Sequence, residues 1–165
     1  MGWIQSANIL ETLILLMLAN CAPVIAKKLL ENRFSYPLDA HLRFIDRNRL
    51  FVPSKTIRGI VLAVLATAAG ATLMGLDWML GALVGGTAML GDLFSSFIKR
   101  WLGMTASSKA PGLDQIPEAL FPLIVCRSWL VLGLGDILVV LILFCAGEIV
   151  LSRVFFAVGL RDRPY

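Results

Sequence analysis

The sequence predicts an all-α integral membrane protein of five transmembrane helices, built as one membrane domain over residues 1–165. Hydrophobic residues make up 58% of the chain and its mean hydropathy is +0.82, whereas soluble domains are roughly 45–50% apolar. Five apolar stretches approach the roughly 20 residues with which a helix crosses a bilayer. Lys and Arg collect in only some of the connections between these stretches, as they do in multi-pass proteins.

The five expected spans are about residues 9–25, 57–74, 78–98, 116–132 and 137–158. We expect helices because backbone groups in lipid must be satisfied within the segment, and a barrel would show period-2 alternation. The first span lacks a basic n-region before it, so it is expected to remain as an anchor. In the third span, Gly81 and Gly85 have small-xxx-small spacing. This spacing indicates close helix packing or room for a lipid chain or phosphate, and both can hold.

Basic residues predict the orientation. Eight Lys and Arg lie between residues 26 and 58, three lie between 99 and 115, and three lie near the C-terminus. The connections around 75–77 and 133–136 hold none. The positive-inside rule then places the N-terminus outside and the C-terminus in the cytoplasm. Two cytoplasmic loops, about 26–56 and 99–115, can therefore meet at one site, and the net charge of +4 suits anionic headgroups before nucleic acid.

Few catalytic classes fit the remaining reactive residues. The three cysteines, Cys21, Cys126 and Cys145, lie in apolar runs without disulfide or metal spacing. The single histidine, His41, excludes an HExxH metal site. Other ionisable residues in apolar runs, namely Glu11, Arg127 and Glu148, are expected to be interhelical partners without a catalytic role.

The stretch from residue 91 to 115 carries the strongest functional signal. Asp92, Ser95, Ser96 and Lys99 are spaced i, i+3, i+4 and i+7, so they share one helical face. A carboxylate on such an apolar helix is costly and points to function. The competing interpretation is a helix-end carboxylate paired with Lys99.

A second carboxylate, Asp114, follows a Pro-Gly turn. Asp92 and Asp114 together suit one or two Mg²⁺ ions, which take carboxylates, water and substrate phosphates without a complete protein cage. Asp114 is also a candidate N-cap of the fourth helix, and an N-cap and a metal ligand are not exclusive.

Polar residues before the second span suit phosphate. Lys55, Thr56 and Arg58 stand at a helix N-terminus, where charge, hydroxyls and free amides meet. The GxxxxGK frame of a P-loop is absent. The alternative is a basic anchor that contacts only lipid headgroups.

Two further segments are candidates for the lipid side of a site. Asn20 either satisfies the carbonyl that Pro23 leaves free or faces a site. The segment 37–44, which contains Asp39, mixes apolar and basic residues and suits a membrane surface. His41 within it is expected to be structural or solvated.

Five motifs in order, NCAP, PLD, PSKTIRG, GDLFSSFIKR and APGLDQ, resemble the small CDP-archaeol synthase family, five-helix relatives of the phosphatidate cytidylyltransferases. The resemblance implies transfer of CMP from CTP to a lipid phosphate with Mg²⁺, releasing pyrophosphate. Carried onto this chain, the family pattern falls on seven residues: Lys55, Arg58, Asp92, Ser96, Lys99, Arg100 and Asp114. We expect Asp92 and Asp114 to hold the metal and, with Lys99, to be catalytic. The expected nucleotide and phosphate ligands are Lys55, Thr56, Arg58, Ser96, Lys99 and Arg100, and the candidates for the lipid are Asn20, Pro23 and Asp39. The implied partners are CTP, a lipid phosphate and the bilayer, with no nucleic acid; a homodimer stays open.

A small transporter or a lipid-binding scaffold is the competing function. It would use the glycine-rich span for packing and the basic loops as anchors. Transporter sites usually lie near the bilayer midplane. The polar residues here gather instead at one end of the expected spans, which favours the enzyme.

Overall fold

The computed structural model describes residues 2–30, 36, 55–104 and 112–160, without the side chains of residues 2–4. These residues form an all-α fold of five helices, as predicted. The helices are α1 (Gly2–Leu30), α2 (Ile57–Leu73), α3 (Trp78–Trp101), α4 (Gln115–Val125) and α5 (Leu134–Ala157). Asp39, His41 and most of the first polar loop lie outside the described residues.

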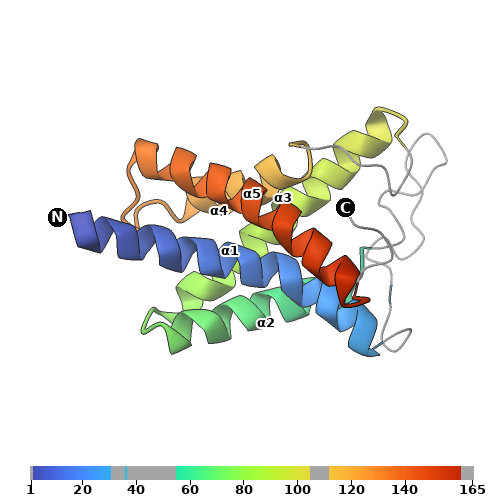
Figure 1. Cartoon of the computed structure of the whole chain (residues 1–165), viewed down its shortest axis with the longest axis horizontal. Coiled ribbons are helices and arrows are strands. Elements are labelled where there is room, and N and C mark those ends of the chain that lie inside the picture. Colours follow the sequence, from blue (N-terminus) through green and yellow to red (C-terminus); the bar gives the residue numbers. More distant parts are fainter. Residues whose placement is uncertain (1, 31–35, 37–54, 105–111, 161–165) are drawn as a thin grey trace.

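Helix α3 is the centre of the bundle, because it packs most extensively against α2 and α4 and also contacts α1. Figure 1 shows that α1 and α5 begin at the end of the molecule where α2 turns into α3. We call this the turn end; there Gln5 Nε2 donates to both carboxylate oxygens of Asp136, at 3.1 and 2.9 Å. The opposite end, where α1, α3 and α5 finish and α2 and α4 begin, is the loop end (Figure 1).

Of the five helices in the described ranges, α1, α3 and α5 are long and apolar enough to cross a membrane. The other two are shorter apolar helices, of 17 residues for α2 and 11 for α4. Helix α5 exposes a row of large apolar side chains, including Leu138, Ile142 and Val150, as a lipid-facing helix does. Among the side chains that the structure describes, three tryptophans are also exposed: Trp78 and Trp129 near the turn end and Trp101 at the loop end.

Glycines let α2 and α3 touch at their backbones. A Cβ added at Gly81 would lie 2.3 Å from the carbonyl oxygen of Thr67, and one at Gly85 would lie 2.2 Å from Thr67 Oγ1. The small-xxx-small spacing is therefore used for helix packing. The buried core beside this contact includes Leu15 and Val84.

Helix α4 is shorter than the expected span. This helix ends at Val125, seven residues before the expected Leu132, and the chain continues in turns. Arg127 closes them: its carbonyl accepts from the Leu132 amide, and its Nε donates to the Leu132 carbonyl, both at 3.1 Å. The expected boundary was wrong because these residues are apolar too, so composition does not show where the helix ends.

Helices α1 and α5 are longer than the expected spans at one or both ends. Helix α1 begins before residue 9 and runs past residue 25 to Leu30, with Pro23 inside it. Helix α5 begins at Leu134, three residues early, because the Asp136 carboxylate accepts from the Gly133 amide at 2.8 Å. A carboxylate in the first turn of a helix satisfies a free amide and favours this start.

Candidate active site

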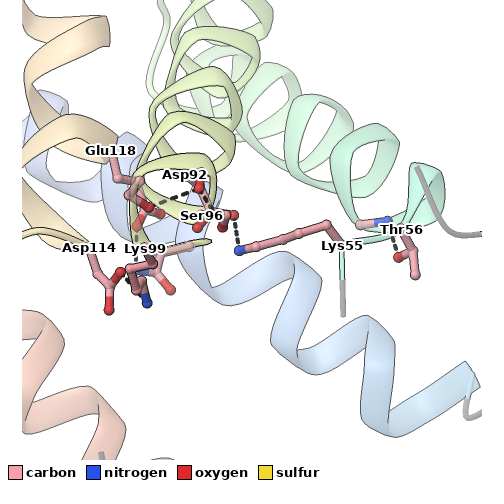
Figure 2. A network of polar contacts seen from close by, with 10 residues as sticks. Lys55, Thr56, Asp92, Ser96, Lys99, Asp114 and Glu118 are labelled. Atoms are coloured by element: carbon pink, nitrogen blue, oxygen red, sulfur yellow. Dashed lines mark hydrogen bonds and ion pairs between the residues drawn. The ribbon is translucent and has the colours of Figure 1, made fainter. Parts of the chain in front are cut away.

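The first ion pair at the loop end joins the chain before α2 to α3. Thr56 caps α2, since its hydroxyl oxygen accepts from the Gly59 amide at 3.2 Å, and this fixes the residue before it. Lys55 Nζ then contacts Asp92 Oδ2 (Figure 2). About a quarter of each side chain is exposed, 26% for Lys55 and 25% for Asp92.

The second ion pair joins α3 to the start of α4. Lys99 Nζ lies 2.5 Å from Asp114 Oδ1, and these side chains are 17% and 31% exposed. Asp114 occupies the N-cap position of α4, but its side chain makes no capping hydrogen bond. Asp92 and Lys99, whose pairing was the competing interpretation, thus form ion pairs with residues of other segments.

A buried carboxylate that the sequence interpretation missed lies beside these pairs. Glu118 in α4 is 6% exposed and accepts a hydrogen bond from Asn20 Nδ2 at 3.4 Å. Asp92, Asp114 and Glu148 are all close enough to interact with it electrostatically. The available signal was its i+4 spacing from Asp114, which places both on one face of α4.

Gly91 lets α4 approach α3 at this point. A Cβ on Gly91 would lie 2.2 Å from the Pro117 carbonyl oxygen and 2.8 Å from Glu118 Cα. Real side chains do not approach so closely, so the small residue beside Asp92 is a condition for bringing the start of α4 to the site.

The remaining expected residues take varied positions. Ser95 and Ser96 are buried and donate their hydroxyls to the Asp92 carbonyl at 2.9 and 2.8 Å. Pro23 packs against the start of α2, since a Cβ on Gly59 would lie 3.4 Å from Pro23 Cβ. Arg58 and Arg100 belong to the first turn of α2 and the last turn of α3. Asn20 contacts the buried Glu118, so its amide is directed toward α4.

The loop end thus offers two part-exposed carboxylates, each neutralised by an ammonium group. Among the described residues, no group of three or more His, Cys, Asp or Glu could hold a metal ion by itself. Two separate carboxylates still fit Mg²⁺, which keeps several waters and takes substrate phosphates as further ligands. Such an arrangement suits a reaction that moves a phosphoryl-type group between two anionic substrates.

The comparisons with known proteins identify the family. The family model described as CarS-like, CDP-archaeol synthase, matches residues 71–165. A CDP-archaeol synthase from Sulfurisphaera tokodaii is 30% identical over 135 residues, which cover 78% of this chain and 81% of that protein. One from Thermofilum pendens is 26% identical and covers 98% of this chain and 84% of the relative.

A solved structure agrees with the sequence matches. It is described as an intramembrane enzyme for archaeal membrane lipid biosynthesis, and it superposes with a TM-score of 0.57 at 29% identity. The match covers 82% of this chain and 92% of the solved chain. The segment that the family model matches includes Asp92, Lys99, Asp114 and Glu118, and the alignment with the Thermofilum pendens protein extends across nearly the whole chain. The chain therefore belongs to the CDP-archaeol synthase family.

Proposed function

We propose that this chain performs the reaction of its family at the loop end, through the two ion pairs of α3. Family membership indicates a membrane enzyme of lipid biosynthesis that transfers CMP from CTP to a lipid phosphate. A phosphate oxygen of the lipid attacks the α-phosphorus of CTP. A new P–O bond forms, the bond from the α-phosphorus to the bridging oxygen breaks, and pyrophosphate leaves with the CDP-lipid as the other product.

Positioning and charge neutralisation carry this reaction, since the attacking phosphate is already ionised and needs little base catalysis. Asp92 and Asp114 would hold Mg²⁺, which would neutralise charge developing on the phosphates. Lys55, from the segment before α2, and Lys99, from the last turn of α3, would bind the triphosphate, and their ion pairs at the loop end support this role (Figure 2). Arg58 and Arg100 add charge on the adjoining helix ends.

The observation that carries this assignment is that lysines from two different segments converge on carboxylates from α3 and α4. A phosphate-transfer site needs both signs of charge within reach of one substrate. The competing transporter or scaffold offers no reason for this convergence at one end of the bundle. Thr56 and Ser96 have hydroxyls occupied by helix contacts, and their part in phosphate binding is a prediction, as is a lipid role for Asn20, Pro23 and Asp39.

We place the loop end in the cytoplasm, where CTP is made, with the N-terminus outside and five passes through the cell membrane. The basic residues flanking this end support this orientation. Cysteines introduced at Ser35 and Ser107, in a parent without its three native cysteines, should react with an impermeant reagent only in opened cells. Labelling of either position in intact cells contradicts the orientation.

The activity test uses purified protein with CTP, Mg²⁺ and a panel of lipid phosphates, scored for pyrophosphate and for the CDP-lipid. Ether-linked archaetidic acid and ester-linked phosphatidic acid form the two main arms. We expect CTP or dCTP to be used in preference to ATP and GTP, and activity to require the divalent cation. Equal turnover with ATP, or no pyrophosphate with any lipid phosphate, contradicts the proposed function.

A further inference from the structure

Each of the two carboxylates proposed to bind a divalent cation already forms an ion pair with a lysine. Lys55 Nζ contacts Asp92 Oδ2, and Lys99 Nζ lies 2.5 Å from Asp114 Oδ1. All four side chains are at least two-thirds buried, with exposures of 17–31%. Charges in such surroundings are screened less than surface charges, so each lysine competes strongly with any cation for its aspartate.

The same two ammonium groups can also donate to a triphosphate. An ammonium is a compact point charge on a flexible four-carbon stem, so each lysine can move between two anions within its reach. Lys55 precedes α2 and Lys99 lies near the end of α3, so the two stems reach the site from different segments. Neither movement requires a helix to shift.

We propose that Lys55 and Lys99 are exchangeable counterions, which hold Asp92 and Asp114 before substrates bind and pass to the triphosphate when a divalent cation takes the carboxylates. This inference rests on the proposed function. Before binding, two lysines balance two aspartates. A divalent cation alone would add two uncompensated positive charges, and CTP alone would bring four negative charges beside two carboxylates. One cation bound with the nucleotide halves the excess negative charge that CTP alone would bring, and a second cation removes it, so the binding of cation and nucleotide is mutually dependent.

Binding measurements without catalysis test this dependence. Mn²⁺, which prefers the same oxygen ligands as Mg²⁺, is titrated into purified protein and followed by electron paramagnetic resonance. The titration is repeated with α,β-methylene-CTP. In this analogue a methylene group replaces the oxygen between the α- and β-phosphorus, so the bond that breaks in the reaction cannot be cleaved. Coupling between two ligands commonly changes affinity by about 5- to 150-fold. We expect the analogue to tighten Mn²⁺ binding within this range, and unchanged Mn²⁺ affinity overturns the proposal.

Removing a lysine should produce opposite effects on the two ligands. Lys55→Met keeps most of the stem and removes the charge, and Lys99→Met does the same at the other pair. A neighbouring charge alters proton binding to a carboxylate by about 10- to 1,000-fold, so we expect Mn²⁺ alone to bind at least about tenfold tighter to either variant. The nucleotide analogue should bind more weakly, and its coupling to Mn²⁺ should shrink.

Two further variants serve as controls. Lys28→Met removes the same charge from an exposed position in the last turn of α1 and should leave Mn²⁺ binding unchanged. Lys55→Arg keeps the charge and should keep weak Mn²⁺ binding in the absence of nucleotide. If Lys55→Met does not fold, Lys55→Gln replaces it. Mn²⁺ affinity that is equal or lower in both charge-removing variants shows that the lysines do not compete with the cation.

Failure of the exchange and failure of the proposed function give different results. If Asp92→Asn and Asp114→Asn abolish Mn²⁺ binding while the lysine variants leave it unchanged, only the exchange is wrong. If the aspartate variants bind Mn²⁺ like the parent and retain CDP-lipid synthesis, the assignment of the metal site is wrong as well.

Discussion

Gly91→Ala tests whether the close approach of α4 to α3 builds the site. The added Cβ would lie 2.2 Å from the Pro117 carbonyl oxygen, 2.5 Å from its carbonyl carbon and 2.8 Å from Glu118 Cα. All three are backbone atoms, so no side chain can rotate away. Since favourable contacts between carbon atoms lie at about 3.5–4.0 Å, the two helices must separate by roughly 1 Å.

Overpacking of this kind costs about 1–3 kcal/mol, occasionally more. For a chain of this size each kcal/mol lowers the melting temperature by about 2–4 °C, so we expect Gly91→Ala to melt roughly 2–12 °C lower in detergent. We also expect CDP-lipid synthesis to fall about a hundredfold, because a 1 Å misplacement of catalytic groups has this order of effect.

Gly86→Ala is the matched control, because it lies in the same helix and its added Cβ meets nothing within 4 Å. It should gain about 0.4–1 kcal/mol, since alanine restricts the unfolded chain and favours helix. Gly147→Ala is intermediate, because its new Cβ meets only the end of the flexible Met17 side chain. The reasoning fails if Gly91→Ala melts and turns over like Gly86→Ala.

Three further substitutions separate chemistry from structure. Asp92→Asn keeps the shape and removes the charge, so kcat should fall on the order of a hundredfold or more over a Mg²⁺ titration; parental turnover at every concentration contradicts the metal site. Asp114→Asn should abolish activity while its free energy of unfolding stays within about 1 kcal/mol of the parent's, because it loses only a part-exposed pair with Lys99 and no capping bond. A stable, active variant would contradict the assignment. Thr56→Ala removes the cap on the Gly59 amide and should cost about 1 kcal/mol in thermal melts, whereas an unchanged melt would mean that the cap contributes nothing.

Periodicity and position in the chain single out Asp92, Lys99 and Lys55, and the structure brings all three to the loop end. Their roles in the site stay predictions, and the sequence did not indicate which residues would pair. Asp92 and Lys99 are seven residues apart, about 10 Å along the helix axis, which is too far for a direct contact without bending both side chains inward. Asp92 pairs instead with Lys55, and Lys99 pairs with Asp114. Such pairing depends on how helices pack, and local sequence patterns carry little information about it.

The end of α4 and the burial of Glu118 were missed for a related reason. Apolar residues continue past Val125, so hydropathy could not distinguish helix from buried turns. Gly133 and Asp136 indicate where α5 begins, but they do not indicate where α4 ends. Glu118 looked like an ordinary acidic residue of a first helical turn. Its burial follows from the absence of a side chain at Gly91, which a single sequence shows only as one glycine among 14.

The exposed tryptophans allow the depth of the chemistry to be estimated. Tryptophan collects at the two membrane interfaces, and Trp78 and Trp101 stand at opposite ends of α3, about 35 Å apart at 1.5 Å per residue. Asp92 is nine residues before Trp101, hence up to about 14 Å inward from that interface along an untilted helix. If Asp92 holds the metal as proposed, the acceptor phosphate has to reach below the headgroup layer. Because hydrophobic mismatch changes that vertical distance, turnover in vesicles should depend on the thickness of the surrounding bilayer even when the acceptor lipid is unchanged.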